Sequence, residues 1–343
     1  MRHSYRLLVS VLPLSVAAGL LYAGLFVKPD ATGPAVQAPP IERRDRLYGL
    51  TVVESDYVWV AGSDGKIRYA RDPRTSGTWT VQNSGVAANL QAIDAWDARR
   101  AVAVGNDGVV IVTGDGGAAW TPSVAPVLAV ANKLTRVRAL ADGGAYAVGE
   151  YNAILRTQDF GRTWERLTPE EDVAWYGFDS NAGRLLVVGE FGRIHSSFDA
   201  GRNWKQIQTP AKAHLTAVAF RSDVEAVAVG LNGTVVRTDD GSRTWSLVDT
   251  GIEEHIYDVI WDQTRYVACG ERGLLIESPD GMHWSPLEST TRFERSSFWF
   301  TQIRKFQSGY LVAGSTVGLL DGGRFRDLSN PSRSALALTP TDR

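Results

Sequence analysis

The chain has 343 residues, a formal net charge of −2 at pH 7, and 44% hydrophobic residues, with 34 glycines and 11 tryptophans. This near-neutral charge gives no general attraction to nucleic acid or anionic lipid, so no nucleic-acid partner is predicted. The only cysteine, Cys269, excludes an intrachain disulfide, and its apolar surroundings predict a small buried side chain. Many glycines and few long stretches of helical periodicity favour an all-β protein.

The first 28 residues predict a membrane anchor. Residues 7–27 are 21 uncharged positions that follow Arg2, His3 and Arg6, long enough to cross a bilayer as one transmembrane helix. A cleaved signal peptide is the alternative, but the apolar stretch is longer than usual and no clear A-x-A cleavage site follows it. Residues 29–45, rich in Pro and Ala, are expected to form a linker. We therefore expect a single-pass inner-membrane protein whose folded part lies in the periplasm.

A repeat of about 40 residues fills the rest of the chain. Each copy is too small to bury its own faces, so it needs neighbouring copies for stability. The spacing predicts a seven-bladed β-propeller with four-stranded blades over residues 46–328, followed by a tail at 329–343. The first blade has its own first strand and the seventh its own last, which favours closure by side-chain packing without strand exchange. The marker is a glycine that ends an apolar run, at Gly62, Gly105, Gly149, Gly189, Gly230, Gly270 and Gly314.

A second motif, [ST]-x-D-x-G-x-x-W, marks the turn between the third and fourth strands. It occurs at residues 113–120, 157–164 and 197–204, with variants at 238–245 and 278–284, while Asp321-Gly322-Gly323 forms a tight hairpin in the seventh copy. We expect the Asp and Ser/Thr oxygens to bond backbone N–H groups of their own turn, and the Trp to pack between blades. A structural role is therefore assigned to Asp115, Trp120, Asp159, Trp164, Asp199, Trp204, Asp240, Trp245, Asp280 and Trp284.

Blade topology places this motif on one face of the ring, and the Gly-x-x-Gly turns with the connections between blades on the other. The second face carries a mixture of charged and aromatic residues, and aromatic and arginine side chains are the usual anchors of protein interfaces. The candidate partner-binding residues there are Tyr151, Trp175, Phe191, Arg272, Arg292, Phe293 and Arg295.

Three glutamates that follow a repeat glycine, Glu150, Glu190 and Glu271, suggest an enzymatic alternative, because glycosidases use paired carboxylates. The string Arg193-Ile194-His195 lacks the proline of the sialidase Arg-Ile-Pro motif, and repetition alone explains the glutamates, so no catalytic residue is assigned. A metal shared by His214 and His255 would need a third ligand. Neither a metal nor a cofactor is predicted.

The [ST]-x-D-x-G-x-x-W motif resembles the Asp-box, or BNR repeat, found in sialidases and many other propellers. The combination of Val-Gly-x-x-Gly turns with intermittent Asp-boxes over residues 47–328 resembles the photosystem II assembly and stability factor family of BNR propellers. That resemblance implies a protein that is not an enzyme. Photosynthetic members bind newly made reaction-centre protein, and relatives in non-photosynthetic bacteria are associated with RND-type exporters.

The predicted membrane anchor favours the second kind of relative. We expect a propeller that docks on an integral membrane protein complex, an RND-type transporter, as an accessory or assembly subunit. A sialidase-like propeller that binds or cleaves carbohydrate, and a photosystem II assembly factor, are the alternatives. The arginine-rich patch of the photosynthetic members has only scattered candidates here, which are Arg136, Arg138, Arg156, Arg184, Arg193 and Arg237.

Overall fold

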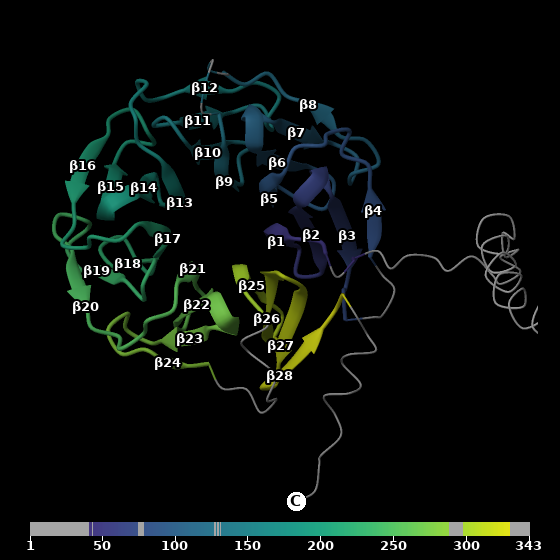
Figure 1. Ribbon diagram of the computed structural model, residues 1–343. Helices are drawn as coiled ribbons and strands as arrows, with labels where there is room; N and C mark the ends of the chain where they lie inside the picture. Colours follow the sequence, from purple (N-terminus) through teal and green to yellow (C-terminus); the bar gives the residue numbers. More distant parts are fainter. Residues whose placement is uncertain are drawn as a thin grey trace, which may run out of the picture. The chain divides into compact units, whose positions relative to one another are not determined.

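The computed structural model describes residues 41–42, 44–74, 79–126, 128, 130, 132–287 and 298–329. Within these residues, seven four-stranded antiparallel sheets stand around a ring (Figure 1), which confirms the seven-bladed all-β propeller. The predicted membrane helix at 7–27 and the tail from residue 330 lie outside the described residues. In the part that is described, no helix is long and apolar enough to cross a membrane.

Each blade consists of four consecutive strands, and their order in the sequence is their order from the centre of the ring to its rim (Figure 1). Blades 1 to 3 are β1 (Leu47–Val53), β2 (Tyr57–Gly62), β3 (Ile67–Arg71) and β4 (Thr80–Gln82); β5 (Leu90–Ala95), β6 (Ala101–Gly105), β7 (Val110–Thr113) and β8 (Thr121–Pro122); and β9 (Leu134–Ala139), β10 (Ala145–Gly149), β11 (Ile154–Thr157) and β12 (Glu165–Arg166). Blades 4 and 5 are β13 (Trp175–Asn181), β14 (Arg184–Gly189), β15 (Arg193–Ser197) and β16 (Lys205–Gln208); and β17 (Leu215–Phe220), β18 (Ala226–Gly230), β19 (Val235–Thr238) and β20 (Ser246–Val248).

Blades 6 and 7 complete the ring, and single 3-10 turns join the second and third strands of four blades. The strands are β21 (Ile256–Trp261), β22 (Tyr266–Gly270), β23 (Leu275–Ser278) and β24 (Ser285–Pro286); and β25 (Phe300–Phe306), β26 (Gly309–Gly314), β27 (Val317–Asp321) and β28 (Arg324–Asp327). The turns are η1 (Ser63–Gly65), η2 (Asn106–Gly108), η3 (Glu190–Gly192) and η4 (Glu271–Gly273).

The repeated glycine has a steric cause that all seven copies share. A methyl group on Gly230 would lie 2.1 Å from the carbonyl oxygen of His214, and the corresponding distances in the seven copies are 2.0 to 2.2 Å. The following residue, Leu231, donates its N–H to that same carbonyl at 3.0 Å. Glycine therefore allows the end of each second strand to bond the residue that precedes the first strand.

Side chains of the innermost strands join every neighbouring pair of blades. Odd-numbered blades use a threonine and even-numbered blades an aspartate, and these residues stand at different positions along the first strand. The threonine bonds are Thr51 Oγ1 to Asp94 Oδ1 (2.6 Å), Thr135 Oγ1 to Trp175 O (2.6 Å), Thr216 Oγ1 to Ile256 O (2.7 Å) and Thr301 Oγ1 to Leu47 O (3.1 Å). The aspartates accept bonds from Ala139 N to Asp94 (2.9 Å), Phe220 N to Asp179 (2.8 Å) and Ile303 N to Asp258 (3.0 Å).

The ring closes without strand exchange, because β1–β4 and β25–β28 form separate sheets. Trp79 of blade 1 packs with Leu311 and Leu319 of blade 7 in one buried cluster. Ile41 belongs to the same cluster and is only 3% exposed. The packed domain therefore begins before residue 46, the boundary that the sequence predicts.

Candidate docking face

The two kinds of turn lie on opposite faces of the ring. Glu190, in a turn between second and third strands, donates its N–H to the carbonyl of Ala174, in a connection between blades, at 3.2 Å. Phe160, in an Asp-box, donates its N–H to the carbonyl of Gly143, in a turn between first and second strands, at 2.9 Å. We call the face of the blade connections the connection face, and the opposite one the Asp-box face.

On the Asp-box face, the Ser/Thr and Asp oxygens of each motif bond the motif's own turn. In the third copy Thr157 Oγ1 contacts Asp159 Oδ1 at 2.7 Å, Gly161 N donates to Thr157 Oγ1 at 3.1 Å, and Thr163 N donates to Asp159 Oδ1 at 3.0 Å. Asp115, Asp199, Asp240 and Asp280 accept the equivalent backbone bonds. The tryptophans Trp120, Trp164 and Trp245 are buried, and Trp204 and Trp284 are half-buried.

The connection face presents six turn tips with a left-handed backbone. Their φ angles lie between 52° and 59°, at Asp64, Asp107, Tyr151, Phe191, Asn232 and Arg272. Asn and Asp tolerate this conformation, whereas in a bulky side chain it costs roughly 1 kcal/mol or more. Blades 3, 4 and 6 therefore carry tip residues that the backbone disfavours, and strain of this kind concentrates at functional sites.

Phe191 is the most prominent of these tips. Its side chain is 57% exposed, and its ring lies 4.9 Å from the ring of His214. Tyr176 packs edge-on against the same imidazole at 5.9 Å, and burial together with the nearby Glu190 raises the pKa of Tyr176 to about 12. The exposed ring is thus fixed in place by a neighbouring blade before any partner arrives.

The remaining candidates separate into three groups. Tyr151 is half-buried and Arg272 is exposed, both on the connection face. Trp175 was predicted as a partner anchor, and this is wrong: it is only 1% exposed, and its Nε1 donates to Asn152 Oδ1 at 2.8 Å. Its indole packs between blades 3 and 4. Arg292, Phe293 and Arg295 lie outside the described residues.

Two of the three glutamates of the enzymatic alternative, Glu150 and Glu190, have structural contacts. Glu150 Oε2 accepts the N–H of Lys133 at 3.3 Å, and Glu190 Oε2 accepts the N–H of Ala174 at 3.1 Å, so both carboxylates hold the start of a first strand. His195 lies between the rings of Trp175 and Trp204, where burial lowers its pKa.

The two other histidines of interest also have contacts that explain them. His214 packs against Phe191, and His255 Nδ1 accepts the N–H of Asn232 at 3.0 Å. Among the described residues, no group of three His, Cys, Asp or Glu side chains is placed to hold a metal ion. Cys269 is buried, and burial raises the pKa of its thiol well above the usual range.

A charged cluster in the centre of the ring is not apparent from the sequence. Arg136 of blade 3 reaches Asp258 of blade 6 at 3.6 Å, and Arg304 of blade 7 bonds the same carboxylate at 2.7 Å. Arg138 pairs with Asp179 at 3.2 Å beside a cavity of about 450 Å³ that Arg304 also lines. Each of these arginines already has a carboxylate partner, so the cluster holds blades together across the channel.

Seven interlocked blades with Asp-box turns define a BNR-type β-propeller. Residues 71–174 match the family model described as photosynthesis system II assembly factor YCF48. This match covers under a third of the chain and agrees with the resemblance to the BNR propeller family that the sequence indicates. A comparison with curated protein sequences found no match.

Three solved structures show how widely the fold is used. YCF48 bound to a D1 peptide has a TM-score of 0.63 and 17% identity, over 82% of this chain and 96% of that one. YCF48 from Cyanidioschyzon merolae has a TM-score of 0.63 and 16% identity, over 81% and 95%. The GH74 xyloglucanase from Xanthomonas campestris has a TM-score of 0.63 and 16% identity, over 80% of this chain and 52% of that one. At such identities these structures share the fold.

Proposed function

We propose that the chain is a non-enzymatic docking propeller that binds a segment of an integral membrane protein complex through its connection face. One observation carries the proposal: Tyr151, Phe191 and Arg272 occupy left-handed turn tips on that face, where Asn or Asp would be more stable. Contact with a partner explains why these three turn tips have residues that reduce the stability of the fold. Aromatic and arginine side chains are also the types that dominate interface energies.

The membrane setting of the proposal comes from the N-terminal sequence. An uncharged stretch at residues 7–27 would anchor the chain in the inner membrane and place the propeller in the periplasm. An RND-type transporter is the proposed partner, with the propeller as an accessory or assembly subunit. A solved structure of the same fold, described as YCF48 bound to a D1 peptide, supports recognition of a peptide segment.

The experiment exchanges each bulky tip for the residue that its backbone favours. Phe191→Asn, Tyr151→Asn and Arg272→Asn should leave the melting temperature unchanged or raise it, because Asn tolerates the left-handed conformation. Capture of the membrane complex from mild detergent should fall by about tenfold for the triple variant, which corresponds to about 1.4 kcal/mol. Asn232 is the natural control, because Asn232→Asp keeps a tolerated residue at the matching tip of blade 5.

The two outcomes separate function from structure. If the triple variant unfolds at a clearly lower temperature, the three side chains are packing residues. Wild-type capture by a stable triple variant would reject the connection face as the docking surface.

A carbohydrate-binding propeller is the second candidate, favoured by the exposed ring of Phe191 and by the shared fold with the GH74 xyloglucanase. Aromatic rings commonly provide an apolar platform for flat ligands. Isothermal titration with xyloglucan oligosaccharides, using wild type and Phe191→Asn, tests it. Saturable binding that the variant loses would favour this candidate over protein docking. A photosystem II assembly factor is the third alternative, and titration with a D1 peptide tests it in the same way.

A further inference from the structure

Each Asp-box turn lies against the preceding blade, on a surface that we call its turn seat. A methyl group on Gly201 of blade 4 would lie 2.9 Å from Leu167 Cδ1 of blade 3. Between blades 2 and 3, the guanidinium of Arg100 lies 3.9 Å from the ring centre of Phe160, in the next Asp-box. In these two turn seats the contacts come from an apolar residue after the fourth strand, Leu167, and from a long side chain before the second strand, Arg100.

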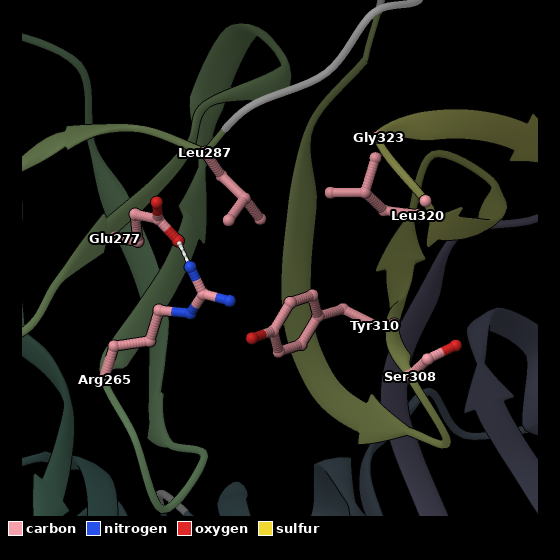
Figure 2. A pocket seen from close by; sticks show the side chains of 9 residues that line it. Arg265, Glu277, Leu287, Ser308, Tyr310, Leu320 and Gly323 are labelled. Carbon is pink, nitrogen blue, oxygen red and sulfur yellow. Dashed lines mark hydrogen bonds and ion pairs between the residues drawn. The ribbon is translucent and has the colours of Figure 1, made fainter.

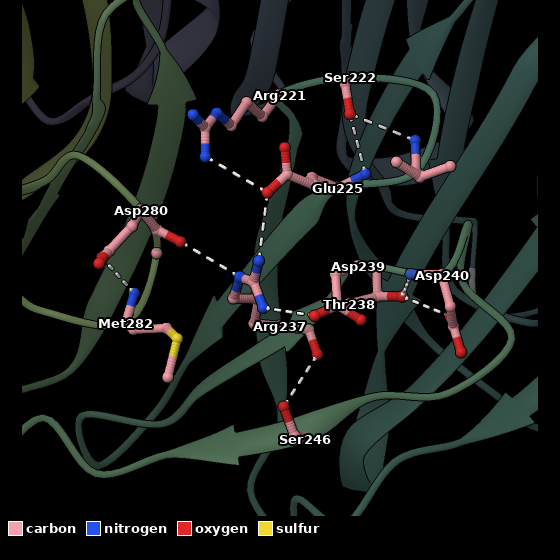
Figure 3. A network of polar contacts seen from close by, with 12 residues as sticks. Arg221, Ser222, Glu225, Arg237, Thr238, Asp239, Asp240, Ser246, Asp280 and Met282 are labelled. Carbon is pink, nitrogen blue, oxygen red and sulfur yellow. Dashed lines mark hydrogen bonds and ion pairs between the residues drawn. The ribbon is translucent and has the colours of Figure 1, made fainter.

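The turn seat between blades 5 and 6 shows how polar side chains of one blade bond the turn of the next (Figure 3). Arg237 Nη2 pairs with Glu225 Oε1 at 3.1 Å, and Arg237 Nε donates to the carbonyl oxygen of Asp280 at 3.2 Å. Asp280 belongs to the Asp-box of blade 6. An ion pair within one blade thus presents a hydrogen-bond donor to the turn of the next blade.

The turn seat between blades 6 and 7 also has an ion pair and an apolar side chain. Arg265 and Glu277 stand at the strand positions of Glu225 and Arg237, because Tyr266 pairs with Ser278 as Ala226 pairs with Thr238. The charges are exchanged, and Arg265 Nη1 contacts Glu277 Oε2 at 2.6 Å. Leu287 occupies the position that Leu167 has in blade 3, three residues after its Asp-box tryptophan.

Blade 7 does not supply the turn that fits this seat. Its β27 and β28 are joined by Asp321-Gly322-Gly323-Arg324, and Leu320 to Phe325 is two residues shorter than Thr157 to Trp164. A cavity of about 360 Å³ lies here, lined by Arg265, Glu277 and Leu287 of blade 6 and by Tyr310, Leu320 and Gly323 of blade 7. Figure 2 shows these side chains facing one space from both blades.

We propose that this turn seat binds a turn of another protein, one with a glycine next to an aromatic residue. Two contacts elsewhere in the ring, Leu167 with Gly201 and Arg100 with Phe160, define the chemistry that fits. Leu287 offers the apolar surface that Leu167 offers to Gly201, and Arg265 offers a guanidinium for an aromatic ring, as Arg100 does for Phe160. The site lies at the edge of the Asp-box face, so it stands independently of docking through the connection face.

The experiment uses a probe taken from the chain itself. The full-length protein is labelled at leucine methyl groups and titrated with a peptide of residues 154–166, which contains Phe160 and Gly161. We expect saturable shifts of the Leu287 and Leu320 methyl signals. A control peptide with Phe160→Ala and Gly161→Val should bind at least about fivefold more weakly, because it lacks both the ring and the small residue.

Two variants block the turn seat in different ways. Ser308→Trp places an indole at the exposed edge of the cavity and should abolish the shifts. Replacing residues 320–325 with the eight-residue sequence of residues 157–164 should fill the seat from within blade 7 and raise the melting temperature. Because this variant lacks Leu320, loss of the Leu287 shift is its readout. The methyl spectrum of the other leucines reports whether each variant keeps the native fold.

Each result decides the proposal. Shifts confined to Leu287 and Leu320 that disappear in either folded variant support it. Absence of shifts at the highest soluble peptide concentration overturns it, as do equal shifts with the control peptide and shifts that survive in Ser308→Trp. If the methyl shifts instead depend on protein concentration without peptide, a second copy of the chain fills the seat and the proposal of a different partner protein is wrong.

Discussion

Substitution of a repeat glycine gives the sharpest stability prediction. In Gly230→Ala the new methyl group would lie 2.1 Å from the His214 carbonyl oxygen, far inside van der Waals contact. The strand end must move, which breaks the 3.0 Å bond from Leu231 N to the same oxygen. A lost hydrogen bond costs about 1 kcal/mol and overpacking about 1–3 kcal/mol, so we expect a loss of about 2–4 kcal/mol.

Thermal unfolding followed by circular dichroism measures this loss. For a domain of this size, 1 kcal/mol corresponds to a fall of about 2–4 °C, so Gly230→Ala should melt roughly 5–15 °C below wild type. Gly114→Ala is the matched control: nothing lies within 4 Å of the added methyl group, and the change should stay within about 0.5 kcal/mol. A Gly230→Ala protein that melts within a degree of wild type would refute the steric explanation of the repeat.

Three further predictions concern the turns and the core. Hydrogen bonds from the backbone and side chain of Asn203, and from Ser197, lower the pKa of Asp199 from 3.8 to about 2. The stability that this carboxylate contributes is therefore complete above pH 4 and is lost as the pH falls through 2. Asp199→Asn should make urea unfolding less sensitive to pH between these two values. Asp159→Ala should cost about 1–3 kcal/mol in urea unfolding without weakening partner capture by the folded fraction, and loss of capture at full stability would show that this turn contacts the partner. Trp175→Ala should cost about 3–5 kcal/mol because it empties a buried site between blades, and an unchanged unfolding midpoint would contradict that assignment.

The regular part of the fold could be predicted because it repeats. The repeat glycines predict seven blades over residues 46–328, and in the structure β1 begins at Leu47 and β28 ends at Asp327. The repeat also predicts which turns share a face, since four antiparallel strands alternate in direction. The local sequence and the length of the repeat are enough to predict these features.

Features that depend on register or on distant blades could not be predicted in this way. Trp175 is an exception, because the repeat does indicate its burial: it pairs with Gly189, and the other six blades have Leu, Ile or Phe at this position. Arg136 and Asp258 meet across the ring although more than a hundred residues separate them. The shortened seventh turn is visible in the sequence, but the cavity beside it requires the neighbouring blade.

Site-specific photo-cross-linking in cells tests the central claim most directly, because it reports which face of the propeller touches a partner. A photo-reactive phenylalanine analogue replaces Phe191 on the connection face or Arg243, which is exposed on the Asp-box face. We predict a cross-link from position 191 to an integral membrane protein, identified by mass spectrometry, and a much weaker one from position 243. A membrane-protein cross-link from position 243 alone would contradict docking through the connection face.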